Sequence, residues 1–241
     1  MKGSTPTMTT LVIATNNAHK VDEIRAILGD TLEYRTLRDL PQAPTADETG
    51  ATFAENARIK SHGIARWLLA NPRFHSDLLT TAKTSPPDAA YPSSALGRSP
   101  VWVLADDSGL EVDALAGAPG VKSARFAADE LQLGSSNAPD AANNAKLLRL
   151  LADVPAARRT GRFRCALALT AVGDALDTFD FDGACEGTLG LAPRGPHGFG
   201  YDPLFVPDGF QETFAELGDA QKNALSHRGQ ALGRLSAWLR R

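Results

Sequence analysis

The sequence predicts an α/β fold, because short runs of apolar, strand-forming residues alternate with stretches whose apolar residues recur at helical spacing. Residues 10–15 and 101–105 are two such runs. At 241 residues, the chain is long enough for one large domain or two small ones. We expect a single domain over residues 10–241. Residues 1–9 contain one lysine and no apolar core, so we interpret them as a flexible tail and not a signal peptide.

Composition and charge narrow the classes of function. The chain has 25 Lys and Arg against 28 Asp and Glu, which gives a net charge of −3. Proteins that bind the phosphate backbone of nucleic acids usually have an excess of basic residues, so we expect no nucleic-acid partner. No window approaches the ~18 consecutive apolar residues of a membrane span, so we expect no membrane partner. Cys165 and Cys185 lack the spacing of a zinc site or a disulfide scaffold, which favours the reducing cytoplasm.

The first strand, residues 10–15, leads through a polar turn at Asn16 and Asn17 into a helix. A helix N-terminus offers free amides and a positive dipole end, and Lys20 adds a charge there, so residues 15–20 are suited to bind phosphate. The alternative is simple N-capping by Asn16 or Asn17. The chain has no P-loop motif and no GxGxxG motif, which argues against the nucleotide-binding classes that carry them.

A second helix begins at a capping box formed by Thr52 and Glu55 and should run to about Leu69. From residue 72 to residue 100 the composition turns to Pro, Ser, Thr and Ala with little periodicity. We expect a surface insertion at about residues 71–99.

Residues 101–105 are apolar throughout, as in a strand covered on both faces, and an acidic turn from Asp106 to Gly109 follows them. We expect the strand to end there, where α/β folds bind ligands, and carboxylates at such a place suit Mg²⁺. Adjacent aspartates in an extended chain point to opposite sides, so at most one faces a ligand. The alternative is an Asx-turn that merely ends the strand.

The rest of the chain predicts a helix over residues 138–151, an antiparallel strand pair at 162–169 and 176–183, and a last helix from Asp219. Residues 195–203 are rich in glycine and aromatic residues, which permit close approach to a ligand and stacking on a base. An ordinary surface loop is the alternative. Lys222, Ser226, His227 and Arg228 are expected on the last helix, facing either a ligand or solvent.

Five segments in this order resemble the inosine/xanthosine triphosphate pyrophosphatases, over about residues 10–240. They are LVIATNNAHKVDEI, DETGATFAENARIKS, LADDSGLEVDALAGAPGVKSARFA, GTLGLAPRGPHGFGYDPLFVP and QKNALSHRGQAL. The resemblance implies an elongated central mixed sheet flanked by helices, two lobes around an active-site cleft, and a homodimer. It also implies Mg²⁺-dependent hydrolysis of ITP, dITP and XTP to the monophosphate and pyrophosphate, which clears deaminated purines from the nucleotide pool.

The resemblance further implies roles for single residues. Asp107 is the catalytic residue and a metal ligand, with Glu48 as the second metal ligand, although the pair Asp47-Glu48 leaves open which side chain reaches the metal. The predicted substrate contacts are Thr15, Asn16, Asn17, Ala18, His19, Lys20 and Lys60 for the phosphates, Ser108, and, for the nucleoside, Phe199, Gly200, Tyr201, Asp202, Lys222, His227 and Arg228. The alternatives are a pyrophosphatase for other modified nucleotides and a nucleotide-binding sensor without catalysis.

Overall fold

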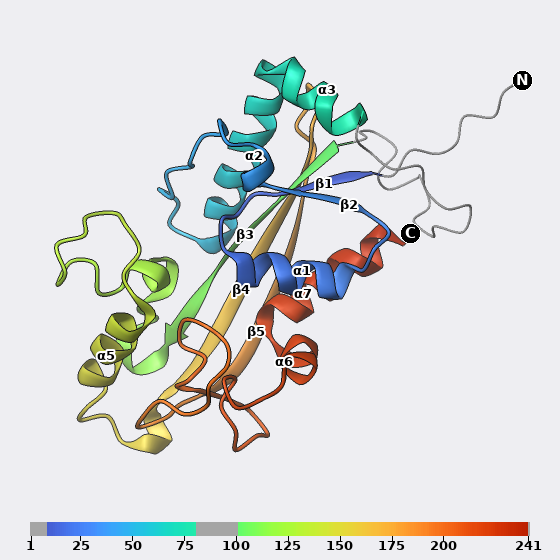
Figure 1. The fold of residues 1–241 in the computed structure, drawn as a ribbon. Coiled ribbons are helices and arrows are strands. Elements are labelled where there is room, and N and C mark those ends of the chain that lie inside the picture. Colours follow the sequence, from blue (N-terminus) through green and yellow to red (C-terminus); the bar gives the residue numbers. More distant parts are fainter. Residues whose placement is uncertain (1–8, 81–100, 241) are drawn as a thin grey trace, which may run out of the picture. The chain divides into compact units, whose positions relative to one another are not determined.

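The computed structural model describes residues 9–80 and 101–240 (Figure 1). Among these residues, strands form a mixed sheet in the order β2-β1-β3-β4-β5-β6, and helices flank it. The α/β class and the mixed sheet predicted from the sequence are confirmed. The strands are β1 (Thr10–Ile13), β2 (Glu33–Thr36), β3 (Val101–Val112), β4 (Thr160–Ala171), β5 (Thr178–Leu189) and β6 (Phe205–Pro207). The α-helices are α1 (Ala18–Leu28), α2 (Phe53–Ala70), α3 (Pro72–Thr80), α5 (Asp140–Leu150), α6 (Asp219–Leu225) and α7 (His227–Leu239).

The chain divides into two compact units. The first contains the residues up to Asp107, residues 166–181 and those from 231 onward, and the second contains residues 108–165 and 182–230. The division falls within β3, between Asp107 and Ser108. The single domain expected over residues 10–241 stays a prediction.

In the first unit, β1 pairs in parallel with both β2 and β3. All four of its residues are buried, as expected of a central strand in a parallel arrangement. Helix α2 begins at the predicted capping box: the Thr52 hydroxyl accepts a hydrogen bond from the Glu55 amide, and the Glu55 carboxylate accepts one from the Thr52 amide. Apolar residues of one face of α2, among them Ile64 and Leu68, pack against residues of β1 and β3.

The surface insertion expected at about residues 71–99 stays a prediction, and its first part is helical, because residues 72–80 form α3. Pro72 is tolerated in the first turn of a helix, and Phe74 and Leu78 stand four residues apart on one face. The Phe74 ring lies 5.0 Å from that of Trp67, and Leu78 is buried in the core of the first unit. Residues 81–100, the rest of the expected insertion, and residues 1–8 of the expected tail lie outside the described residues.

Two further predictions need correction. Strand β3 does not end before Asp106 but continues to Val112, so the acidic pair lies inside a strand. The last helix is two helices, because Ser226 has an extended backbone (φ −64°, ψ 156°) between α6 and α7. The Ser226 hydroxyl accepts a hydrogen bond from the Gly229 amide, which caps the new helix.

The second unit has an aromatic core. The Phe163 ring lies 4.8 Å from that of Phe205 and 5.9 Å from that of Phe214, and Leu147 of α5 is buried with them. The neighbouring strands β4 and β5, which both units share, are joined by residues 172–177 alone, so they run antiparallel as predicted.

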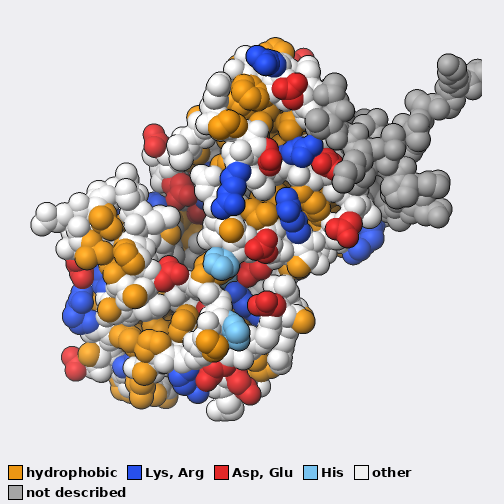
Figure 2. Space-filling model, viewed as in Figure 1, with side chains coloured by type: hydrophobic (Ala, Val, Ile, Leu, Met, Phe, Trp, Pro, Cys, Tyr) orange, Lys and Arg blue, Asp and Glu red, His pale blue; other side chains and the backbone are white. Residues whose placement is uncertain are grey.

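The surface carries mixed charge. Figure 2 shows Lys and Arg side chains interspersed with Asp and Glu over the visible face, without a continuous basic strip on the described residues there. None of the helices in the described ranges has the length and hydropathy that crossing a membrane requires.

Candidate active site

The N-terminus of α1 holds the predicted phosphate-binding residues. Asn17 caps the helix, because its Oδ1 accepts a hydrogen bond from the Lys20 amide at 3.3 Å, and the Thr15 hydroxyl accepts one from the Asn17 amide at 3.2 Å. The capping alternative is therefore observed, and it uses only part of the first turn. Exposed residues Asn16, Ala18 and His19 surround the cap and leave the dipole end open to solvent.

The two adjacent aspartates of β3 take different lysine partners. Asp106 forms an ion pair with Lys20, and its carboxylate is almost fully buried. Asp107 Oδ1 lies 2.7 Å from Lys60 Nζ, and only 6% of Asp107 is exposed. The separate partners agree with side chains that alternate along an extended strand.

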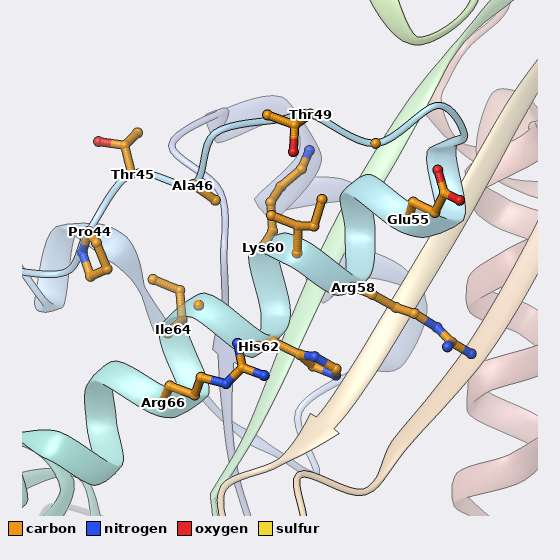
Figure 3. A pocket seen from close by; sticks show the side chains of 13 residues that line it. Pro44, Thr45, Ala46, Thr49, Glu55, Arg58, Lys60, His62, Ile64 and Arg66 are labelled. Atoms are coloured by element: carbon orange, nitrogen blue, oxygen red, sulfur yellow. The ribbon is translucent and has the colours of Figure 1, made fainter.

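Lys60, on α2, joins three segments of the first unit. Its Nζ lies 2.7 Å from Asp107 Oδ1, 2.8 Å from Glu48 Oε1 and 3.1 Å from the carbonyl oxygen of Asp106. Figure 3 shows Lys60 reaching from α2 toward the loop at Thr49, whereas Arg58 points away toward the strands. The loop and α2 also border an open cavity of about 680 Å³, lined by residues 44–46, 49, 50 and the exposed side of α2.

Burial and charge act in opposite directions on this pair. Burial raises the pKa of Asp107, and Lys60 and Lys20 offset the rise only in part. Burial alone would lower the pKa of Lys60, but Asp107 and Glu48 together outweigh it and raise that pKa. Lys60 therefore stays a cation, and Asp107 is a stronger base than an ordinary aspartate.

Asn56 is a site residue that the sequence interpretation missed. It is fully buried, its Nδ2 donates to Asp107 Oδ2 at 3.2 Å, and its Oδ1 accepts from the Gly50 amide at 2.8 Å. It thereby fixes both the carboxylate and the loop that carries Glu48. The signal was available: Asn56 stands four residues before Lys60 in a quoted motif, so the two share a helix face.

Gly50 is required by the same contact. A Cβ at this position would lie 2.7 Å from Glu55 Cβ and 2.8 Å from Asn56 Oδ1, too close for any other residue. The glycine lets the loop approach the start of α2 closely enough for the Asn56 hydrogen bond.

The oxygen atoms around Lys60 are suited to a hard divalent cation. Magnesium prefers one or two carboxylates completed by water and substrate phosphates, and Glu48 and Asp107 supply two. Glu48, and not the exposed Asp47, shares Lys60 with Asp107, which favours Glu48 as the second ligand. Over residues 9–80 and 101–240, no group of three or more His, Cys, Asp or Glu side chains forms a ready-made metal cage.

In the second unit, Asp202 organises the predicted nucleoside segment. Its buried Oδ2 accepts hydrogen bonds from Lys222 Nζ at 2.8 Å and from the Phe199 amide at 2.9 Å. Two cations lie over the Phe199 ring: Lys222 Nζ is 4.8 Å and the centre of the Arg228 guanidinium is 5.7 Å from the ring centre. Both cations are buried, and together with the ring they form an aromatic and basic group whose chemistry suits a nucleobase.

Arg228 and His227 open α7 at the edge of this group. Arg228 is 1% exposed, and its Nη2 donates a hydrogen bond to Ser108 Oγ at 2.8 Å. Two residues predicted to bind the substrate are therefore in direct contact with each other. The His227 ring stacks on Phe163 at 4.7 Å. Tyr201 is buried, and its hydroxyl donates to the Ser123 carbonyl at 2.9 Å, so its ring anchors the segment in the core.

Two residues of α5, which the sequence interpretation did not select, hold the backbone of Gly200. The Gly200 amide donates to Asp140 Oδ2 at 2.7 Å, and its carbonyl accepts from Asn144 Nδ2 at 2.9 Å. Gly200 has a positive φ of 62°, which favours glycine. The predicted residues thus fall into two groups, each within its own unit: a carboxylate and lysine group in the first unit, and an aromatic and basic group in the second.

The amino-acid sequence matches one protein family and several named relatives. A sequence profile of the Ham1 family matches residues 11–238. A dITP/XTP pyrophosphatase of Exiguobacterium sibiricum is 44% identical over 230 residues, which cover 95% of this chain and 96% of the relative. A dITP/XTP pyrophosphatase of Geobacillus kaustophilus is 42% identical over 229 residues, 95% of this chain and 93% of the relative.

Solved structures agree with the sequence comparisons. A Ham1 protein from Staphylococcus aureus is 32% identical, with a TM-score of 0.72 over 96% of this chain and 98% of that one. A HAM1 protein from Coxiella burnetii is 34% identical, with a TM-score of 0.71 over the same shares of the two chains.

Proposed function

Because the chain belongs to the Ham1 family, we propose that it is a nucleoside triphosphate pyrophosphatase that hydrolyses dITP, ITP and XTP to the monophosphate and pyrophosphate. Relatives named dITP/XTP pyrophosphatase match nearly the whole chain, and this observation is the main support for the proposal. Such an activity clears deaminated purine nucleotides from the precursor pool. The proposal includes a cytoplasmic location, a homodimer and no nucleic-acid partner, the last supported by the net charge of −3.

The first unit would bind the triphosphate and carry out the chemistry. Attack on the α-phosphorus needs a water that loses a proton, and Asp107 is the base, supported by the raised pKa of its buried carboxyl group. The amides of the first turn of α1 and the Lys20 ammonium would hold phosphate oxygens and balance charge on the leaving pyrophosphate. Glu48 and Asp107 would hold Mg²⁺, which when bound supplies positive charge to the phosphates and acidifies water.

The second unit would select the base. Phe199 would stack on the purine, and Lys222 and Arg228 beside it carry donors only. Hypoxanthine and xanthine have an oxygen at position 6 that accepts hydrogen bonds, whereas adenine has an amino group that donates. An adenine amino group facing a donor costs ~1–3 kcal/mol, or roughly ten- to a hundredfold in kcat/KM.

The experiment is pyrophosphate release from ITP, XTP, GTP, ATP and dTTP, with and without Mg²⁺, for the unaltered protein and for Asp107→Asn. We expect Mg²⁺-dependent release from ITP and XTP, and a loss of at least about a hundredfold in Asp107→Asn. Asp113→Asn is the control, since that exposed aspartate pairs with Arg162 in the second unit. Release of orthophosphate would contradict the reaction class, and binding of ITP without turnover would favour the sensor.

A further inference from the structure

The Lys60 ammonium has all its hydrogen-bonding capacity engaged. An ammonium has three N–H donors, and Lys60 Nζ has three oxygen atoms within 3.1 Å: Asp107 Oδ1, Glu48 Oε1 and the carbonyl oxygen of Asp106. The side chain is also largely buried, with 14% of its surface exposed. Lys60 therefore cannot donate to a phosphate oxygen unless it first releases one of these partners.

The same oxygens are those that the proposed function gives to the metal ion. One oxygen of Glu48 and one of Asp107 each lie within 2.8 Å of the Lys60 nitrogen, so the ammonium already lies between the two carboxylates. A divalent ion bound to both carboxylates would be a second cation at the same place. The ammonium and the ion thus compete for one site, because like charges at this distance repel strongly in a partly buried environment.

We propose that Lys60 is a built-in counter-ion that neutralises Glu48 and Asp107 until a divalent cation enters, and that this entry releases Lys60 to bind the triphosphate. The inference rests on the proposed function, since it takes Glu48 and Asp107 as the metal ligands. It accounts for the ion pairs that both carboxylates, one of them almost fully buried, form with the same ammonium.

Two consequences follow from this competition. Lys60 weakens the binding of a divalent ion to the free protein, because the ion must displace an ion pair. A polyphosphate strengthens that binding, because it offers the displaced ammonium a new partner, and the coupling is reciprocal. Lys20 is the natural comparison, since its ammonium pairs with Asp106 instead of with the two proposed ligands.

The test is a calorimetric titration of the full chain with Mn²⁺ in the absence of nucleotide. Lys60→Met removes the charge and keeps an unbranched side chain, so we expect Mn²⁺ to bind about 5- to 150-fold more tightly, the usual range of such couplings. Lys20→Met should give a clearly smaller change. Lys60→Arg, which keeps the charge, should show no gain over the unaltered protein. Unchanged or weaker Mn²⁺ binding by Lys60→Met would overturn the proposal.

A second measurement tests the release of Lys60 directly. Inorganic tripolyphosphate should tighten Mn²⁺ binding to the protein beyond the binding of Mn²⁺ to tripolyphosphate itself, measured separately. If Lys60→Met is folded, it should lose most of this gain; if it does not fold, Lys60→Gln takes its place. Equal gains in the unaltered and neutral variants would contradict the release of Lys60. Pyrophosphate release from ITP is scored separately, so failure of the enzymatic proposal is distinguishable from failure of this one.

Discussion

Removal of the Asn56 side chain should damage both the stability of the first unit and its chemistry. Asn56→Ala deletes a hydrogen bond of 3.2 Å to the Asp107 carboxylate and leaves the Gly50 amide without its acceptor at 2.8 Å. A bond to a charged group contributes ~1.5–3 kcal/mol and one between neutral groups ~0.5–1.5 kcal/mol. The expected loss in the free energy of unfolding is therefore about 2–4.5 kcal/mol, since Asn56 is fully buried.

Urea unfolding measures the first effect, and steady-state kinetics with ITP measures the second. Asn56 acts on the reaction only through the position of Asp107 and of the loop that carries Glu48. We therefore expect kcat to fall by about tenfold or more with a smaller change in KM. The lost hydrogen bond stabilises the ionised Asp107 carboxylate, so its removal should raise the pKa of Asp107. The acidic limb of the pH profile of kcat/KM should therefore shift to higher pH.

Asn71→Ala is the matched control on the same helix. Asn71 closes α2, where its Nδ2 donates to the Trp67 carbonyl at 2.8 Å, and it is partly exposed. Its replacement should cost no more than about 1 kcal/mol and leave the kinetics with ITP unaltered. If Asn56→Ala loses no more stability than Asn71→Ala and keeps its pH profile, Asn56 does not hold Asp107 in place.

Three other predictions concern single residues. Arg228→Met should lower the ratio of kcat/KM for ITP over ATP by roughly tenfold, because it removes donors suited to the 6-oxo group; an equal loss for both nucleotides would instead indicate a phosphate contact. Burial raises the pKa of the Cys185 thiol from 9.0 to about 11. The folded protein therefore holds that proton more tightly than the unfolded chain, so this contribution to stability is complete below about pH 9 and is lost toward pH 11. Urea unfolding at pH 8 and 10.5 should show a smaller decline for Cys185→Ala than for the unaltered protein. Leu78→Ala should cost about 2–5 kcal/mol, since Leu78 is 4% exposed in the core of the first unit; a change within 0.5 kcal/mol, as is usual at exposed sites, would show that α3 adds little to the fold.

Local sequence signals were sufficient where the structure depends on neighbours in the chain. The capping box at Thr52 and Glu55 predicted the start of α2, and the polar turn at Asn16 and Asn17 predicted the start of α1. They failed where distant contacts decide. In helix α3, Phe74 and Leu78 contact the core of the first unit, and this packing stabilises the helix, which no local pattern reveals.

The acidic pair is the clearest case of a distant contact. Two aspartates suggested the end of a strand, since unpaired carboxylates do not remain buried. Lys20 and Lys60 come from two different helices, and each neutralises one aspartate, so β3 can continue through both. The sequence motifs named all four residues but not their pairing, because spacing along the chain does not encode which lysine reaches which carboxylate.

The pairing also distinguishes the two aspartates chemically. Asp106 forms an ion pair with Lys20, at the N-terminus of α1, so substrate phosphate that binds Lys20 would weaken an ion pair of a buried carboxylate. Asp107 has Asn56 and Lys60 on its two oxygen atoms, with Glu48 on the same ammonium. A divalent ion that takes the place of Lys60 would keep Asp107 neutralised, whereas the lysine that pairs with Asp106 is the one proposed to hold substrate phosphate. This difference in what can replace each lysine, more than burial or position in the strand, favours Asp107 as the residue that meets metal and substrate.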